Sequence, residues 1–189
     1  MCYNLEVSLS TGIFSYLSGY LILQRELTKN EYHCVLFFLL FSTVQFADSL
    51  LWISEMKKNM LNYITTSFII PALLSSQVFF NIYVFNKIRN PLILFFMVLY
   101  ILGLFYTFNG YSKPLCSNNI SSPRWGNKEI SLWQAFLFAA LICYPDLKLF
   151  SLSIVAILFI KYIIKGSIGS LWCFIAAFTG IFYYFTFGK

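Results

Sequence analysis

Histidine and charged side chains are scarce in this chain of 189 residues. It contains one histidine, His33, and only 11% of its residues are Asp, Glu, Lys or Arg. A histidine-based metal site would need cysteine or carboxylate partners, yet no CxxC and no HxxxH spacing occurs. We therefore expect neither a metal centre nor another cofactor.

Motifs for covalent catalysis and phosphate binding are also missing. The chain has no GxSxG element, no glycine-rich phosphate loop, and no candidate base other than His33 at a predicted helix start. A retinal-binding protein would carry a lysine deep in its last helix, but here none precedes Lys189. Carriers with a Pro-Gln pair do not match either, because Pro71 is followed by Ala72. We expect this protein not to be an enzyme.

Apolar side chains, in contrast, are abundant. Hydrophobic residues make up 59% of the chain and the mean hydropathy is +0.74, values outside those usual for a soluble domain. The net charge of +6 arises mostly in short gaps between apolar runs, where lipid headgroups would lie. The basic clusters, Lys57-Lys58 and Lys87-Ile88-Arg89, adjoin membrane-length segments, so nucleic acid is not an expected partner. We predict an integral membrane protein whose partner is the lipid bilayer, with a homo-oligomer left open.

Seven apolar runs approach the length that crosses a bilayer. A hydrocarbon core about 30 Å thick takes about 20 helical residues, with a range of about 17 to 25. The runs cover residues 6–24, 34–54, 61–85, 91–109, 130–145, 148–165 and 168–187. Since no gap could hold a second domain, we predict an all-α, polytopic transmembrane bundle of seven spans over residues 1–189, with a long loop at 110–129.

The fifth and sixth runs leave an alternative open. Each is close to the short limit for a span, and only Pro145 to Lys148 separates them. They are also compatible with a re-entrant hairpin beside five spans. Both interpretations place the chain ends on opposite faces of the membrane.

Small residues form stripes in the first and last runs. The first has Ser8, Gly12, Ser15 and Gly19 at helical spacing, and the last has Gly169, Cys173, Ala176, Ala177 and Gly180. Such stripes let helix backbones approach closely in lipid. We interpret them as packing surfaces.

The charges in the loops do not set the orientation, because seven Lys and Arg residues lie on one predicted face and six on the other. Two weaker signals share the face of the long loop. Asn119 begins an Asn-Ile-Ser glycosylation sequon, and Cys2 and Cys116 could form a disulfide in an oxidising compartment. We therefore predict that the N-terminus is outside or lumenal.

Polar residues inside the second run are the main functional signal. Gln45, Asp48 and Trp52 share one helical face, and an ionisable group in a span usually faces the bundle interior and pairs there. We expect Asp48 to point inward. Other polar residues predicted in the same leaflet are Glu6, Asn62, Thr65, Thr66, Gln134 and Lys161.

Two interpretations of these polar residues remain. In one, they line a polar vestibule for a small solute, ion or proton, with Lys161 as counter-charge to Asp48 or Glu6. In the other, they form an interhelical hydrogen-bond network that fixes the bundle, and Lys161 reaches to the headgroups.

The third run has its own polar track. Pro71 frees a backbone carbonyl one turn earlier and often kinks a membrane helix, while Gln77 and Asn81 lie one turn apart on one face. A hinge beside a polar stripe suits a solute pathway. Ordinary helix packing also tolerates it.

Three short stretches resemble a family without an assigned activity. They are Met1-Cys2-Tyr3 followed by Glu6-Val7-Ser8, VQFADSLLW at 44–52, and SSPRWGN at 121–127. Together they are similar to small polytopic membrane proteins of giant DNA viruses and some algae, although this chain departs from that pattern at Tyr3, Asp48 and 121–126. The resemblance implies a viral or host endomembrane location, a membrane-entry motif at the start, and Arg124 and Trp125 capping the vestibule near Glu6.

We therefore expect a small transporter-like or channel-like bundle, with Glu6, Gln45, Asp48, Gln134 and Lys161 on its inner polar face. The rival expectation is a structural or assembly protein of a viral or organellar membrane that acts through protein-protein contacts, and a membrane enzyme comes third. A change in flux on replacing Asp48 would favour the first.

Overall fold

The computed structural model describes residues 4–84, 90–117, 120–143, 147–165, 167–171 and 178–188, and most of these are helical. The helices are α1 (Leu5–Leu23), α2 (Lys29–Ile53), α3 (Met60–Ile64), the π-helical η1 (Thr65–Ile69), α4 (Ile70–Val84), α5 (Pro91–Thr107), α6 (Leu132–Cys143), α7 (Leu147–Leu158), the π-helical η3 (Phe159–Ile164) and α9 (Thr179–Thr186). Residues 168–171 are also helical. The prediction of a helical chain is confirmed.

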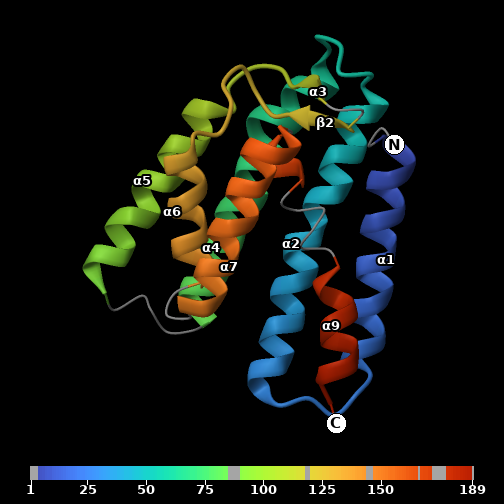
Figure 1. The fold of residues 1–189 in the computed structure, drawn as a ribbon, viewed down its shortest axis with the longest axis vertical. Coiled ribbons are helices and arrows are strands. Elements are labelled where there is room, and N and C mark those ends of the chain that lie inside the picture. Colours follow the sequence, from blue (N-terminus) through green and yellow to red (C-terminus); the bar gives the residue numbers. More distant parts are fainter. Residues whose placement is uncertain are drawn as a thin grey trace.

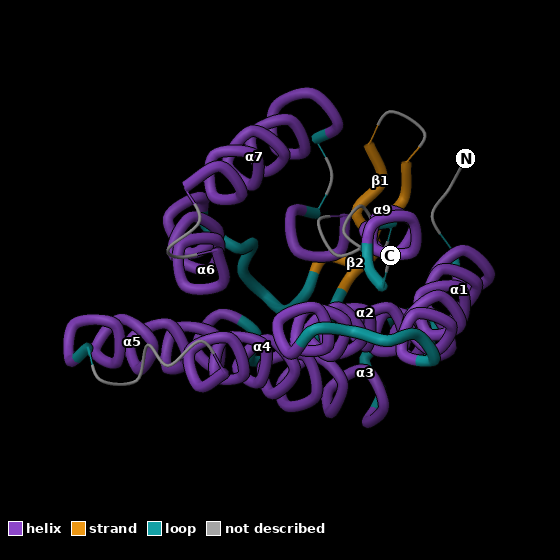
Figure 2. Tube along the Cα trace, turned by 90° about the horizontal axis from the view of Figure 1, so that it is seen from below, coloured by secondary structure: helices purple, strands orange, loops and turns teal. Residues whose placement is uncertain are grey.

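The helices form two packed layers. Figure 2 shows α5, α4, α2 and α1 side by side in one row, with α6 and α7 on one side of it and α9 against α1 and α2. The two ends of the chain lie at opposite ends of the molecule (Figure 1). The end that holds the start of α1 also holds α3 and the long loop, and we refer to it as the loop end.

Two helices in the described part of the chain are long and apolar enough to cross a membrane, Lys29–Ile53 and the continuous helix Met60–Val84. Shorter apolar helices occupy Pro91–Thr107, Leu132–Cys143 and Phe150–Ile164. The helices therefore coincide with the predicted runs, but a count of seven spans is not confirmed.

The long loop contains strands, which the all-helical prediction did not include. β1 (Lys113–Ser117) pairs antiparallel with β2 (Ile120–Arg124), and Lys113 lies opposite Arg124. An apolar-run argument has no signal for this hairpin, because the segment is short and polar. The hairpin sets the position of Trp125, the residue that follows β2.

Side-chain caps fix where the helices begin. Asn4 and Asn90 accept hydrogen bonds from the first turns of α1 and α5, and Pro91 occupies the first turn of α5. Thr28 and Glu31 form a reciprocal capping box at the start of α2. These local signals explain why helix boundaries fall close to the ends of the apolar runs.

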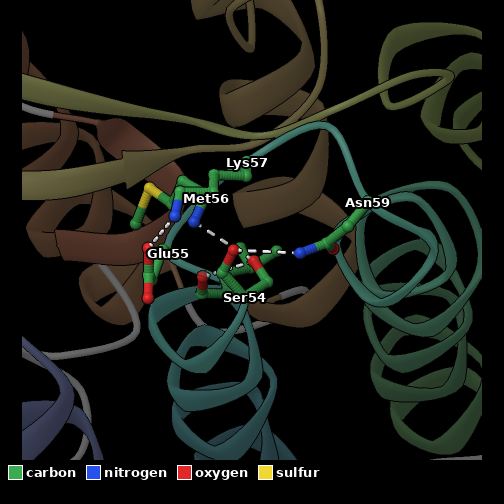
Figure 3. A network of polar contacts seen from close by, with 6 residues as sticks. Ser54, Glu55, Met56, Lys57 and Asn59 are labelled. Atoms are coloured by element: carbon green, nitrogen blue, oxygen red, sulfur yellow. Dashed lines mark hydrogen bonds and ion pairs between the residues drawn. The ribbon is translucent and has the colours of Figure 1, made fainter.

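A polar turn joins α2 to α3 (Figure 3). Ser54 Oγ donates to the Leu51 carbonyl at 2.6 Å and accepts from the Met56 backbone N–H at 3.2 Å. Asn59 Nδ2 donates to the Ser54 carbonyl at 3.1 Å, and Lys57 forms an ion pair with Glu55. These contacts hold Glu55 and Met56 at positive φ, a backbone region that costs energy for residues other than glycine.

The small-residue stripe of α1 is buried, as a packing surface requires. Its buried residues are Ser8, Thr11, Gly12, Ser15, Ser18, Gly19 and Ile22. A Cβ on Gly19 would lie 2.4 Å from Leu39 Cδ2, so α1 and α2 approach closely at this point. Gly169 and Gly180 of the last run are buried too, whereas Cys173, Ala176 and Ala177 lie outside the described residues.

Candidate functional site

Asp48 is the centre of the buried polar interior. Its side chain is 0% exposed, and within the described ranges it is the only fully buried residue of the four charged types. Its Oδ1 accepts a hydrogen bond of 2.7 Å from Trp125 Nε1, and its Oδ2 accepts one of 2.7 Å from Ser170 Oγ. Three distant parts of the chain therefore meet at this carboxylate: α2, the segment after β2, and the helical residues 168–171. The expectation that Asp48 points inward is met.

The helical repeat of α2 explains this placement. Gln45 is also 0% exposed and Ser49 is 4% exposed, so the predicted polar face is the buried one. Ser49 Oγ donates back to the Gln45 carbonyl at 2.8 Å. Trp52, at the end of the same face, is only partly buried.

Trp125 reaches Asp48 because the chain around it packs very closely. Its side chain is 2% exposed and meets the Phe108 ring edge to face, with 5.8 Å between centroids. Gly126 follows at φ +75°, and a Cβ there would lie 2.8 Å from the Phe108 Cα. A Cβ on Gly169 would lie 2.3 Å from Trp125 Cζ3. Both glycines are needed for the indole to occupy this position.

A second polar cluster fastens the long loop to the bundle. Asn62 Nδ2 donates to the Ser112 carbonyl at 3.0 Å, and Asn62 Oδ1 accepts from the Ser112 backbone N–H at 2.8 Å. Thr66 Oγ1 lies 2.7 Å from Ser112 Oγ, and Ser67 Oγ accepts from the Gly110 N–H at 3.0 Å. Asn62 and Thr66 were expected in a shared vestibule with Asp48, but these bonds attach them to the loop.

Thr65, Thr66 and Ser67 belong to the π-helical segment η1, one turn before Pro71. Proline has no N–H to donate to the carbonyl of residue 67, and a π-helical turn is one known response of a helix to such an interruption. The predicted irregularity at Pro71 therefore takes the form of a local π turn.

Gln77 and Asn81 share a buried face of α4, as their spacing predicts. Asn81 Nδ2 donates to the Leu141 carbonyl of α6 at 2.8 Å. Gln77 is 0% exposed, and neither Nε2 nor Oε1 has a hydrogen-bond partner among the residues that the structure describes. Buried amides normally have hydrogen-bond partners, so Gln77 is a candidate to bind a water molecule or a polar solute.

The predicted counter-charge for Lys161 was wrong. Lys161 Nζ lies 3.0 Å from Glu129 Oε2, and the two side chains are 35% and 46% exposed. Glu6 is exposed in the first turn of α1, so it is not part of the buried interior. Helical spacing places Lys161 near the loop end correctly, but it contains no information on Glu129, which follows the hairpin.

Gln134 and Arg124 lie at the border of the interior. Gln134 Nε2 donates to Thr107 Oγ1 at 2.6 Å, and its Oε1 accepts from the Ser131 backbone N–H at 3.1 Å, so it joins α6 to α5. Arg124 is half-buried, and its Nε has no partner among the described residues. The resemblance placed Arg124 and Trp125 over Glu6; in the structure Trp125 contacts Asp48.

The predicted disulfide and glycosylation site remain predictions, because Cys2 and Asn119 lie outside the described residues. Cys116 lies in β1. Within the described ranges, no group of three or more His, Cys, Asp or Glu side chains is arranged to hold a metal ion.

Sequence reasoning missed Ser170, Glu129 and Ser112, although each makes a defining contact. Ser170 is adjacent to Gly169, which belongs to the recognised stripe of small residues, so the stripe was the one available signal. Glu129 and Ser112 are loop residues whose partners depend on the hairpin.

Two small cavities adjoin Trp125 and its neighbours, and a larger groove is also present in the described part of the chain. The inner cavity, about 30 Å³, lies between the core helices and touches Trp125 and Gln134. The outer pocket, about 10 Å³, is lined by Arg124, Glu129 and Lys161 among others. The lateral groove, about 420 Å³, is apolar and lies between α5, α6 and α7.

Comparisons of the chain with protein-family models, with curated proteins and with solved structures find no match.

Proposed function

We propose that the chain is a multi-pass integral membrane protein of the transporter-like or channel-like kind. Asp48 is the group that a small solute, ion or proton meets inside the bundle. The observation that carries this proposal is the carboxylate itself, 0% exposed and held by Trp125 and Ser170 from remote parts of the chain. Ionisable groups buried among apolar helices are costly and usually functional.

The outer surface supports a location in the membrane. Large apolar side chains are exposed on α1, α5, α7 and α9, and Leu17, Leu102, Val155 and Phe182 are each more than half exposed. Soluble monomers rarely expose contiguous apolar surface on this scale. Lipid tails would cover these side chains at no cost.

The orphaned polar atoms support a hydrated interior. Among the described residues, neither the Gln77 amide nor the Ser8, Ser42 and Thr65 hydroxyls have a hydrogen-bond partner. Each unpaired buried group costs about 1–3 kcal/mol. Water or a polar solute that bonds to them would remove this cost, as expected along a pathway.

A structural or assembly role is the second candidate, because parts of the interior are tightly filled. The inner cavity has room for about one water molecule, and the loop is fastened by Asn62, Thr66 and Ser67. The lateral groove and the exposed Trp133 beside it offer an apolar surface to a partner helix. In this role Asp48 anchors the loop and nothing passes through the bundle.

The resemblance to the giant-virus and algal proteins adds a location to the proposal. We place the protein in a viral or host endomembrane with its N-terminus outside or lumenal. Retention in the membrane pellet after alkaline carbonate washing tests the multi-pass membrane location.

Flux through reconstituted vesicles tests transport. The purified protein is incorporated into liposomes, and the decay of imposed proton, Na⁺, K⁺ and Cl⁻ gradients is compared with protein-free liposomes. Asp48→Asn preserves the size of the side chain but removes the charge. Glu26→Gln, at an exposed acid between α1 and α2, is the matched control.

We expect wild type and Glu26→Gln to dissipate one of these gradients and Asp48→Asn to lose that flux. Equal flux in wild type and Asp48→Asn would show that Asp48 does not take part in the pathway. Wild-type flux no greater than that of protein-free liposomes would reject transport of these ions and favour the structural role.

A further inference from the structure

Trp125 separates two of the cavities. The inner cavity and the outer pocket have three lining residues in common: Trp125, Ile130 and Ile168. The indole is 2% exposed and forms the boundary between the two cavities together with Ile130 and Ile168. A route from the outer pocket to the inner cavity would pass between these three side chains, of which the indole is the largest.

The two cavities differ in chemistry. The outer pocket is polar, with Arg124, Glu129, Lys161 and Ser167 in its lining, and the Glu129–Lys161 ion pair is partly exposed to the outside. The inner cavity is lined mainly by core side chains such as Leu74, Leu104 and Phe138. The outer pocket is therefore the side from which a polar solute arrives, and the indole lies between it and the core.

We propose that Trp125 is the gate of the pathway proposed above, and this inference rests on that function. In the closed state, which the structure represents, the indole N–H is bonded to Asp48 and the ring blocks the passage between the two cavities. In the open state the indole leaves Asp48 and the cavities join.

The same contact links opening to solute binding. Trp125 Nε1 occupies Asp48 Oδ1, so a cation or a hydrogen-bond donor that takes this oxygen displaces the indole. The pathway is thereby assigned to cationic or hydrogen-bond-donating solutes, because these compete for a carboxylate oxygen.

The local backbone is suited to such a movement. Trp125 lies between β2 and α6, in the non-helical segment 125–131, so the ring can move without unwinding a helix. Gly169 has no side chain where the ring rests, and a Cβ there would overlap it. One hydrogen bond and ring contacts, rather than a continuous helix, therefore hold the gate closed.

Labelling of a cysteine in the inner cavity tests the gate without relying on flux. Ala135, 5% exposed, lines the inner cavity. The five native cysteines are replaced by serine, Ala135→Cys is introduced, and its reaction with a charged, membrane-impermeant methanethiosulfonate is followed in vesicles. Trp125→Phe and Trp125→Ala are compared with Trp133→Ala, a control at a tryptophan that is 71% exposed and does not line the inner cavity.

Trp125→Phe keeps a ring but loses the bond to Asp48, so the labelling rate should rise about tenfold. Trp125→Ala also removes the ring and should raise the rate further, whereas Trp133→Ala should leave it unchanged. A core tryptophan with no gating role would leave a sealed apolar cavity on replacement by alanine. A labelling rate that is unchanged in both Trp125→Phe and Trp125→Ala would contradict the proposal that Trp125 is a gate.

Flux on the same vesicles separates the two proposals. If the Trp125 variants are labelled faster but no variant shows flux, the proposal of transport is rejected. Trp125 would then be a gate to a binding site. If flux depends on Asp48 but the labelling rate does not change when Trp125 is replaced, only the proposal that Trp125 is a gate is rejected. Trp125→Phe keeps the test decisive if Trp125→Ala does not fold, because it changes the interior least.

Discussion

Replacing Gly169 with alanine tests how Trp125 is held against Asp48. The added Cβ would lie 2.3 Å from Trp125 Cζ3, 2.7 Å from Cε3 and 2.9 Å from Ile130 Cδ1. Real Cβ atoms do not approach other atoms so closely, so the indole must shift. A shift of this size breaks the 2.7 Å bond between Trp125 Nε1 and Asp48 Oδ1.

The cost can be assembled from its parts. Overpacking of a filled site costs about 1–3 kcal/mol, and loss of a hydrogen bond to a charged group costs about 1.5–3 kcal/mol. Alanine returns about 1 kcal/mol of helix propensity relative to glycine. We expect a net loss of about 1.5–5 kcal/mol, which corresponds to a fall in Tm of about 3–20 °C for a chain of this size.

Thermal unfolding of the purified protein in detergent measures this loss, and a double-mutant cycle assigns it. A phenylalanine in place of Trp125 lacks the indole atoms Cζ3 and Cε3, so Gly169→Ala should cost little in a Trp125→Phe background. Gly103→Ala is the matched control, because a Cβ there meets only Gln134 Nε2 at 3.6 Å. That control should be neutral or slightly stabilising.

The reasoning fails if Gly169→Ala lowers Tm equally in the wild-type and Trp125→Phe backgrounds. It also fails if Gly169→Ala unfolds at the same temperature as Gly103→Ala. In either case the indole is not packed against Gly169, and the route by which tertiary packing places Trp125 on Asp48 would be different.

Three further predictions concern other polar groups. Gln77→Leu removes a buried amide that has no hydrogen-bond partner among the described residues, so we expect a higher Tm, because burying an unpaired polar group costs about 1–3 kcal/mol. The same change should reduce any flux through the bundle. A lower Tm would mean that the amide has a hydrogen-bond partner. Asn62→Ala should destabilise the fold by about 1–3 kcal/mol, since it leaves the Ser112 carbonyl without its donor and the Ser112 N–H with only its longer bond of 3.2 Å to Thr66 Oγ1. Faster proteolysis of the long loop in this variant would support the prediction. The Lys57 side chain, through its hydrogen bond and its charge, lowers the pKa of the Glu55 carboxyl from its ordinary value of 4.5. The ion pair therefore stabilises the fold above pH 4.5 and loses this effect as the pH falls through the lowered pKa. A Tm difference between wild type and Glu55→Gln that does not shrink as the pH is lowered below 4.5 would contradict this reasoning.

Much of the helical structure was predictable because its causes are local. Apolar runs set the positions of the helices, and caps such as Asn4, Thr28 and Asn90 set their starts. The hairpin β1–β2 was not predictable in this way, because strand pairing in a short polar segment depends on the surface that it packs against. The number of membrane spans also stays a prediction, since only two helices in the described part of the chain meet the length and composition that a span requires.

The candidate site also has a part that the sequence predicts and a part that only the tertiary structure decides. The spacing of Gln45, Asp48 and Ser49 was enough to predict a buried polar face, and the structure has that face inside. The partners were not predictable: Asp48 meets Trp125 and Ser170 rather than Lys161, and Lys161 meets Glu129. Each of these contacts joins residues at least 32 positions apart in the chain.

By itself, then, the sequence determined which residues are helical and which faces of α1, α2 and α4 are buried, because both follow from repeats of a few residues. Tertiary structure alone decided what faces the buried carboxylate. That choice depends on how the helices cross, where the loop folds back and which glycines leave room for an indole, and these are long-range packing properties that no local pattern contains.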